Sequence, residues 1–226
     1  MNCLLCNRQV PLKLSWRELL RIGPLREETV CSHCWGQFAH YPEPHCRGCG
    51  RTTKAGQLCQ ECHQWKQELG WHLDHQCLYQ YNDAMKEFMH RYKFQGDYRI
   101  RSVFTQAMAQ QLDKYQADII TTVPIAQQTW LTRGFNQVQG IIDRPTEELL
   151  AVISNEKRPQ STRDRQERLA LKQPFCWVDD KSRQSVYGKR VVLVDDVYTT
   201  GRTMYHAAGL FREAGVKSVK TFSLAG

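Results

Sequence analysis

Apolar and polar residues follow two different patterns along the chain, and the change comes near residue 70. From Trp71 onward, short apolar runs alternate with stretches in which apolar residues recur every three or four positions. Such alternation indicates strands and amphipathic helices. The preceding part contains many turn-forming residues and little periodicity. The pattern predicts a small irregular module over residues 1–68 and an α/β domain over residues 71–226.

Both element types are predicted within the second part. Helices are expected over residues 83–94, with Asp83 as its N-cap, and over 98–115 and 203–215. Strands are expected over residues 75–81, 117–125, 175–178, 189–196 and 219–225. Residues 147–154 fit a helix and a strand equally well, whereas residues 131–137 and 155–174 are expected to be loops. The strand–helix–strand order at the end implies a right-handed crossover and a Rossmann-like, mostly parallel sheet.

Cysteine spacing changes the interpretation of the first 68 residues. Eight of the ten cysteines form four C-x-x-C pairs, and each pair can supply two thiolates to a tetrahedral zinc ion. Two such sites would leave no coordination position open for water, so the sequence predicts a double zinc ribbon with two structural zinc ions. The predicted ligands are Cys3, Cys6, Cys31, Cys34, Cys46, Cys49, Cys59 and Cys62.

Two other chemistries use the same spacing: redox-active C-x-x-C pairs and iron–sulfur clusters. A redox pair normally stands alone beside a thioredoxin-like βαβ unit, which the pattern does not predict here. The sequence leaves open which pair joins which. Sharing between the first and second pairs, and between the third and fourth, closes the shorter loops and is favoured. Gly50, after the third pair, is expected to adopt a left-handed conformation that turns amides toward sulfur.

Charge and hydropathy narrow the class of protein only slightly. The formal charge is +8, but eight zinc-bound thiolates would lower it considerably, so charge alone is weak support for nucleic-acid binding. Mean hydropathy is low, and no apolar run approaches the roughly 18 residues of a membrane span. The first residues lack the pattern of a signal peptide, so a cytoplasmic protein is expected.

The stretch "VVLVDDVYTTGRT", residues 191–203, carries the clearest candidate chemistry. Ligands of open α/β sheets bind beyond the carboxyl ends of strands, where Asp195 and Asp196 are predicted to lie. The loop that follows leads into a helix N-terminus, whose amides favour an anion. Carboxylates beside a phosphate-binding loop suit a ribose 5-phosphate. The predicted binding residues are Asp195, Asp196, Thr199, Thr200, Gly201, Arg202 and Thr203.

Three other kinds of site share parts of this stretch. A Walker B strand would require a G-x-x-x-x-G-K-[ST] loop, which the chain lacks. A receiver-domain phosphorylation site would place the acidic pair near the start of its domain. A plain strand–turn–helix with a solvated turn is the remaining alternative.

The stretch resembles the signature of type I phosphoribosyltransferases that binds 5-phosphoribosyl 1-pyrophosphate (PRPP). "VPIAQQTWLTRGFNQ", residues 123–137, and "QSTRDRQER", residues 160–168, are similar to elements of the ComF family of ComFC-type competence proteins. "KFQGD", residues 93–97, and the cysteine-rich start also resemble that family. Arg163 and Asp164 depart from the family pattern, which has Leu and Ser there.

The resemblance implies a type I phosphoribosyltransferase fold that binds PRPP with Mg²⁺ and acts in natural competence. It also implies catalytic roles for Asp195, Asp196 and Arg133, and flexible-loop roles for Gln160, Arg165 and Arg168. An active phosphoribosyltransferase of nucleotide metabolism and a non-catalytic zinc-ribbon interaction protein remain alternative functions.

Possible partners are single-stranded DNA and a competence helicase or another DNA-import protein. Cations and aromatic rings together are typical of single-strand binders. The zinc module offers Arg47, Arg51 and Lys54, with Trp35 and Trp65 after cysteine pairs. The alternative for both tryptophans is that they pack within the protein core.

Overall fold

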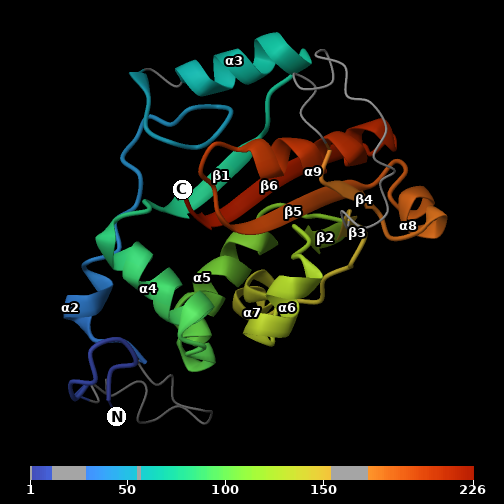
Figure 1. Ribbon diagram of the computed structural model, residues 1–226. Coiled ribbons are helices and arrows are strands. Elements are labelled where there is room, and N and C mark those ends of the chain that lie inside the picture. Colours follow the sequence, from blue (N-terminus) through green and yellow to red (C-terminus); the bar gives the residue numbers. More distant parts are fainter. Residues whose placement is uncertain (1, 12–28, 55–56, 154–172) are drawn as a thin grey trace, which may run out of the picture.

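The computed structural model describes residues 2–11, 29–54, 57–153 and 173–226 (Figure 1). A four-stranded sheet lies at the centre, in the order β1-β6-β5-β2, and every neighbouring pair is parallel. Its strands are β1 (His75–Tyr79), β2 (Ile119–Thr122), β5 (Arg190–Val197) and β6 (Ser218–Ala225). The predicted α/β fold with a mostly parallel sheet is confirmed.

Helices cover both faces of this sheet, which explains why β5 is apolar on both sides. Val192 and Val194 pack into one buried cluster with residues of three helices. Val191 and Leu193 pack into a second cluster with α9. The helices of the first face are α4 (Asp83–Phe94), α5 (Ser102–Asp113) and α7 (Gln137–Ile142), and α9 (Arg202–Glu213) covers the other.

A second, two-stranded antiparallel sheet pairs β3 (Leu150–Val152) with β4 (Phe175–Trp177). The stretch that fitted helix and strand equally well is therefore a strand. Just before β3, Glu147 makes a parallel bridge to Thr121 of β2, which places this small sheet beside the central one. The predicted loop over residues 155–174 connects its two strands, and residues 154–172 lie outside the described part of the chain.

Several boundaries differ from the prediction for local reasons. Asn82, not Asp83, caps α4, because its side chain accepts the Met85 amide at 3.0 Å. The expected helix over residues 98–115 begins as a 3-10 turn, η2 (Tyr98–Arg101), and continues as α5. The helix α8 (Asp180–Ser185) was not predicted; the Asp179 carboxylate caps it.

The loop predicted over residues 131–137 is confirmed only at residues 134–136. The structure instead has two short helices, α6 (Gln127–Arg133) and α7, which meet there. Gly134 ends α6 with a left-handed φ of 78°, and the Asn136 side chain caps α7 by accepting two amides. The Gly–Phe–Asn signal therefore marks a helix–turn–helix.

The cysteine-rich part lies along the α/β domain and contains α2 (Ser32–Trp35) and α3 (Gln60–Leu69). Phe38 joins the buried cluster of α4 and α5, with its ring 4.9 Å from Phe104. Cys49 and Cys62 join the cluster of α9. Contacts therefore run across the boundary predicted between residues 68 and 71. Within the described parts, no helix has the length and apolar character needed to cross a membrane.

Candidate functional site

The acidic pair lies on β5 itself, because the strand continues to Val197. Successive strand residues point to opposite faces, so the two carboxylates face different sides of the sheet. Asp196 is 4% exposed, and its Oδ1 accepts a hydrogen bond from Lys93 Nζ of α4 at 2.8 Å. Its Oδ2 is buried with no hydrogen-bond partner among the described residues. A buried carboxylate oxygen without a donor is costly, so this atom marks a place where a ligand donor would be stabilised.

Asp195 faces the α9 side and is half-buried. Its Oδ1 accepts the backbone N–H of Asp196 at 2.8 Å. Burial raises the pKa of the Asp195 carboxyl, and the neighbouring negative charge of Asp196 raises it further. The Asp196 amide and the Lys93 ammonium oppose this shift of the pKa. The pair thus has one carboxylate paired with a cation and another that is protonated more easily than usual.

The loop after β5 turns sharply into α9. Gly201 has a φ of +76°, and a Cβ at this position would lie 2.2 Å from Tyr198 Oη. The Gly201 carbonyl accepts the Tyr205 amide at 2.8 Å and so begins the helix. The N-cap residue Gly201 has no side chain to cap this N-terminus, and the Arg202 amide has only a long contact of 3.5 Å to Thr200 Oγ1, so the first turn of α9 can offer amides to an anion. The predicted binding residues beside it are exposed: Thr199, Thr200, Arg202 and Thr203.

Arg133 lies at the end of α6 and reaches the same region as Lys93. Its Nε donates to the Lys93 carbonyl at 3.2 Å, and a terminal nitrogen donates to Gln137 Oε1. Its guanidinium carbon lies 5.8 Å from the centre of the Phe94 ring. The "KFQGD" and "RGFNQ" elements are far apart in the sequence. The structure brings them together next to the buried Asp196.

Lys93 was not among the predicted site residues, although it begins the "KFQGD" element quoted for the family resemblance. The same element supplies Asp97, which pairs with Arg91 at 2.8 Å and with Arg99 at 3.2 Å. Hydrogen bonds from these two arginines, together with their positive charges, lower the pKa of Asp97 despite its burial. Arg91 also donates to the carbonyls of Leu4 and Leu5 beside the first cysteine pair. The element thus joins the cysteine-rich part to the acidic site.

The predicted flexible-loop residues Gln160, Arg165 and Arg168 lie outside the described residues. The described end of this connection is held against α9. The Gln173 amide donates to the His206 carbonyl at 2.8 Å, and the Trp177 ring packs edge-on against Phe211 at 5.1 Å. The β3–β4 ribbon therefore holds this end of the connection beside the helix that follows the phosphate-type loop.

The four cysteine pairs form two clusters, and in each the four sulfur atoms lie within 4.8 Å of one another. The first and second pairs share one cluster and the third and fourth share the other, as the shorter loop closure predicted.

The amides of Gly48 and Cys59 donate to Cys46 Sγ at 3.4 and 3.2 Å. Gly50 has the expected left-handed φ of 73°, but its amide donates to the Cys46 carbonyl and not to sulfur. Four converging thiols with amide donors suit a closed tetrahedral site. We call the two groups the first cluster (Cys3, Cys6, Cys31, Cys34) and the second cluster (Cys46, Cys49, Cys59, Cys62).

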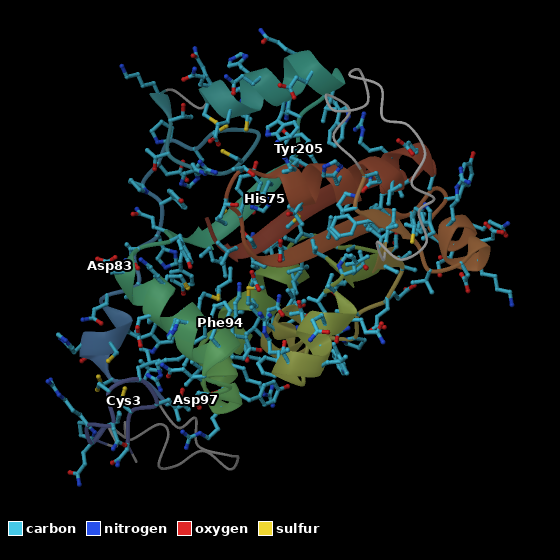
Figure 2. The ribbon with its side chains drawn as sticks, viewed as in Figure 1. Cys3, His75, Asp83, Phe94, Asp97 and Tyr205 are labelled. Carbon is cyan, nitrogen blue, oxygen red and sulfur yellow. The ribbon has the colours of Figure 1, made fainter. Side chains whose placement is uncertain are left out.

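The clusters lie in separate parts of the molecule. Figure 2 shows Cys3 of the first cluster at the same end as Asp97, whereas Tyr205 of α9 lies at the other end, beside α3. The second cluster packs with Tyr198, Met204 and Tyr205, the residues that surround the loop after β5. Only the second cluster therefore borders the loop, as far as the described chain extends.

The residues predicted to contact DNA do not form one free patch. Trp35 packs edge-on against Phe104 at 5.7 Å, and Trp65 stacks on Tyr205 at 4.4 Å. Both tryptophans thus pack against rings of the α/β domain, but neither is buried: Trp35 is 36% exposed and Trp65 is half-buried. Arg51 pairs with Glu61 at 3.1 Å and contacts the loop after β5. Arg47 and Lys54 are exposed.

Comparison with known proteins gives matches over the whole chain. Residues 102–226 match the family described as "Phosphoribosyl transferase domain". The chain is 36% identical to "Competence protein ComFC" of Streptococcus pneumoniae (strain ATCC BAA-255 / R6), covering 99% of each protein. It is 33% identical to "Competence protein ComFC" of Bacillus subtilis (strain 168), covering 98% of this chain and 93% of that protein. A solved "allosteric regulatory enzyme of purine biosynthesis" aligns with a TM-score of 0.37 and 24% identity, over 55% of this chain and 25% of that one.

Proposed function

Because the chain belongs to the ComF family of competence proteins and carries a phosphoribosyl transferase domain, we propose that it binds PRPP with Mg²⁺ at the acidic end of β5. The observation that carries this proposal is the buried, unpartnered Oδ2 of Asp196. A ribose hydroxyl would donate to it and remove the cost of leaving a buried acceptor unpaired. Asp195 offers a second acceptor at the same end of β5, on the opposite face of the sheet.

The loop and α9 would bind the 5′-phosphate of PRPP. Small and hydroxylated residues line the loop, and the N-cap residue of α9 is a glycine with no capping side chain. Backbone amides at such an end, aided by the helix dipole, favour a phosphate. Acceptors for hydroxyls and donors for a phosphate thus lie within one short segment, residues 195–203, which matches the two ends of a ribose 5-phosphate.

Mg²⁺ prefers hard oxygen ligands, and the half-buried Asp195 carboxylate is a ligand of this kind at the same end of β5. Bound together with PRPP, the ion would supply neutralising charge for the pyrophosphate. Lys93 balances the charge of Asp196 in the buried site. The planar guanidinium of Arg133 would bind a pyrophosphate oxygen, with Arg165 and Arg168 as further candidates from the loop.

Isothermal titration with Mg²⁺ and PRPP tests the binding proposal. In the Asp195→Asn/Asp196→Asn variant we expect binding to be lost, because hydrogen bonds to charged acceptors contribute about 1.5–3 kcal/mol each. Asp180→Asn, an exposed carboxylate on α8, is the control and should bind like the parent. Unchanged affinity in the double variant, with an unchanged melting temperature, would contradict the proposal. Pyrophosphate release with a panel of bases, measured in the same samples, distinguishes an active transferase from a protein that only binds PRPP.

We further propose that each cysteine cluster holds one structural Zn²⁺. The proposal is supported by four convergent sulfurs per cluster and by the amide donors of the second cluster. Four thiolates would leave no open position, so no catalytic step is assigned to these metals.

A role in natural competence is supported by the names of two relatives, both called competence proteins, and we propose that it involves incoming DNA. We propose single-stranded DNA as the partner, with a competence helicase or another DNA-import protein as the alternative. Exposed Arg47 and Lys54 are candidate phosphate contacts in the described part of the chain.

A further inference from the structure

Two side chains next to the second cluster donate hydrogen bonds to backbone carbonyls of the loop after β5. The Arg51 guanidinium donates to the Thr199 carbonyl, and Trp65 Nε1 donates to the Thr200 carbonyl at 3.1 Å. Arg51 comes two residues after Cys49, and Trp65 comes three residues after Cys62. Both donors are therefore placed by the fold of the cluster, although they lie more than 130 residues from their acceptors, with sequence separations of 148 and 135.

Both donors are held in place by contacts of their own. Arg51 pairs with Glu61 of α3 at 3.1 Å, and its guanidinium carbon lies 5.3 Å from the centre of the Tyr198 ring. The Trp65 ring stacks on Tyr205 of α9 with an interplanar angle of 23°. Tyr198 precedes the loop and Tyr205 follows it, so the same two side chains contact the loop and its flanking residues. This arrangement restricts both partners before any ligand binds.

The direction of these carbonyls determines the direction of two amides. In a planar trans peptide, the C=O and N–H bonds point in opposite directions. Since the Thr199 and Thr200 carbonyls point toward the second cluster, the amides of Thr200 and Gly201 point away from it. No hydrogen bond within the described residues uses these two amides. They are thus free to form an anion-binding nest on the side of the loop opposite the cluster.

We propose that Arg51 and Trp65 are positioning residues that orient the peptides of the phosphate-binding loop, so that the second cluster is a working part of the PRPP site. This inference rests on the proposed binding of PRPP. The two clusters then differ in what they contact. The second orients the loop, whereas residues beside the first accept hydrogen bonds from Arg91 of α4 at the carbonyls of Leu4 and Leu5. Metal loss from the second cluster should therefore weaken PRPP binding directly.

Trp65→Phe isolates the hydrogen bond, because phenylalanine keeps a ring against Tyr205 but removes the indole N–H. We expect PRPP affinity, measured by isothermal titration with Mg²⁺ present, to fall about fivefold to tenfold, as for one net hydrogen bond. Zinc content and melting temperature should not change. Trp71→Phe is the matched control, since Trp71 also packs on Tyr205, at 5.2 Å, and donates no side-chain hydrogen bond within the described residues.

Tryptophan fluorescence supplies a second measurement that a merely structural role would not move. PRPP should change the emission of the parent and of Trp71→Phe, and this change should be smaller in Arg51→Lys, which keeps every tryptophan of the chain. If the Trp65 variant loses zinc or unfolds, Arg51→Lys decides by the same measurements, because lysine keeps the charge toward Glu61 but not the guanidinium fork.

The outcomes separate the inference from the function on which it rests. A parent protein that does not bind PRPP overturns the proposed function and the inference together. A parent that binds PRPP, with Trp65→Phe and Arg51→Lys binding it equally well, overturns only the inference. Weaker binding in both variants, at unchanged zinc content, supports it.

Discussion

At the scale of single residues, close neighbours limit which side chain can stand at Gly201 and at Asp196. Gly201 combines a left-handed φ with direct contact to the Tyr198 ring, so a larger residue is excluded for two independent reasons. The two carboxylate oxygens of Asp196 have different surroundings. One accepts a hydrogen bond from Lys93, and the other has no donor among the described residues. At this scale, Gly201 depends on a neighbour three residues away, whereas Asp196 depends on Lys93 from a distant segment.

Gly201→Ala is expected to lose PRPP binding and to lower the free energy of unfolding by about 1–3 kcal/mol. The reason is backbone strain in the left-handed region together with the clash against Tyr198. Denaturation in urea and titration with PRPP measure both effects. Gly209→Ala is the control: it lies inside α9 with no atom within 4 Å of a new Cβ, so alanine should stabilise the helix by about 0.5–1 kcal/mol. Equal stability for the two variants would contradict the strained turn.

At the scale of elements, the strand β5 and the two clusters define the site. The strand places Asp195 and Asp196 on opposite faces, so each meets a different set of neighbours. Each cluster joins a tight C-x-x-C turn to a second one, and without metal such modules rarely keep their fold. The clusters differ in what they support, because only the second lies against the loop within the described chain.

Purified protein should contain two zinc ions per chain and little iron, as measured by elemental analysis. Replacing Cys46 and Cys49 by serine should remove one zinc, unfold its surroundings and abolish PRPP binding. Replacing Cys3 and Cys6 should also remove one zinc but should affect PRPP binding less, because the first cluster packs near α4 and not on the loop. A single zinc in the parent, or visible absorbance typical of an iron–sulfur cluster, would refute this assignment.

At the scale of the whole molecule, the cysteine-rich part and the α/β domain share buried side chains on both faces of the sheet. Trp35, Trp65 and Arg51 also make contacts across this boundary, although Trp35 is 36% exposed and the other two are half-buried. The proposed contact with DNA would therefore use cations other than Arg51, which is engaged by Glu61 and Thr199. In the described part of the cysteine-rich region, Arg47 and Lys54 remain exposed.

Binding to labelled single-stranded DNA, followed by fluorescence anisotropy, should weaken steeply with salt, by about 0.7 in logarithmic slope per phosphate contact. Arg47→Ala with Lys54→Ala should reduce this slope. Lys181→Ala with Arg183→Ala, two exposed cations on α8, is the charge-matched control.

An absence of binding at low salt would favour a protein partner, such as a DNA-translocating helicase. Salt-sensitive binding that survives the Arg47/Lys54 change would move the contact to Arg163, Arg165 and Arg168.

The sequence by itself determined features that depend on spacing within a few residues. The C-x-x-C pairs, the strand that ends in two acids, and the loop with Gly201 are all local patterns, and a turn or strand imposes their geometry directly. Apolar periodicity likewise located most helices and strands. It failed at residues 131–137, where two short helices depend on Gly134 and Asn136 at their ends more than on an apolar stripe.

Only the tertiary structure decided which distant residues meet. Lys93 reaches Asp196 across 103 positions of sequence, and Arg51 reaches Thr199 across 148. Such pairs leave no periodic trace, because they arise when the packing of whole elements brings their ends together. Local geometry therefore fixed the chemical groups available for binding, whereas the packing of the second cluster against α9 decided how the loop amides are directed.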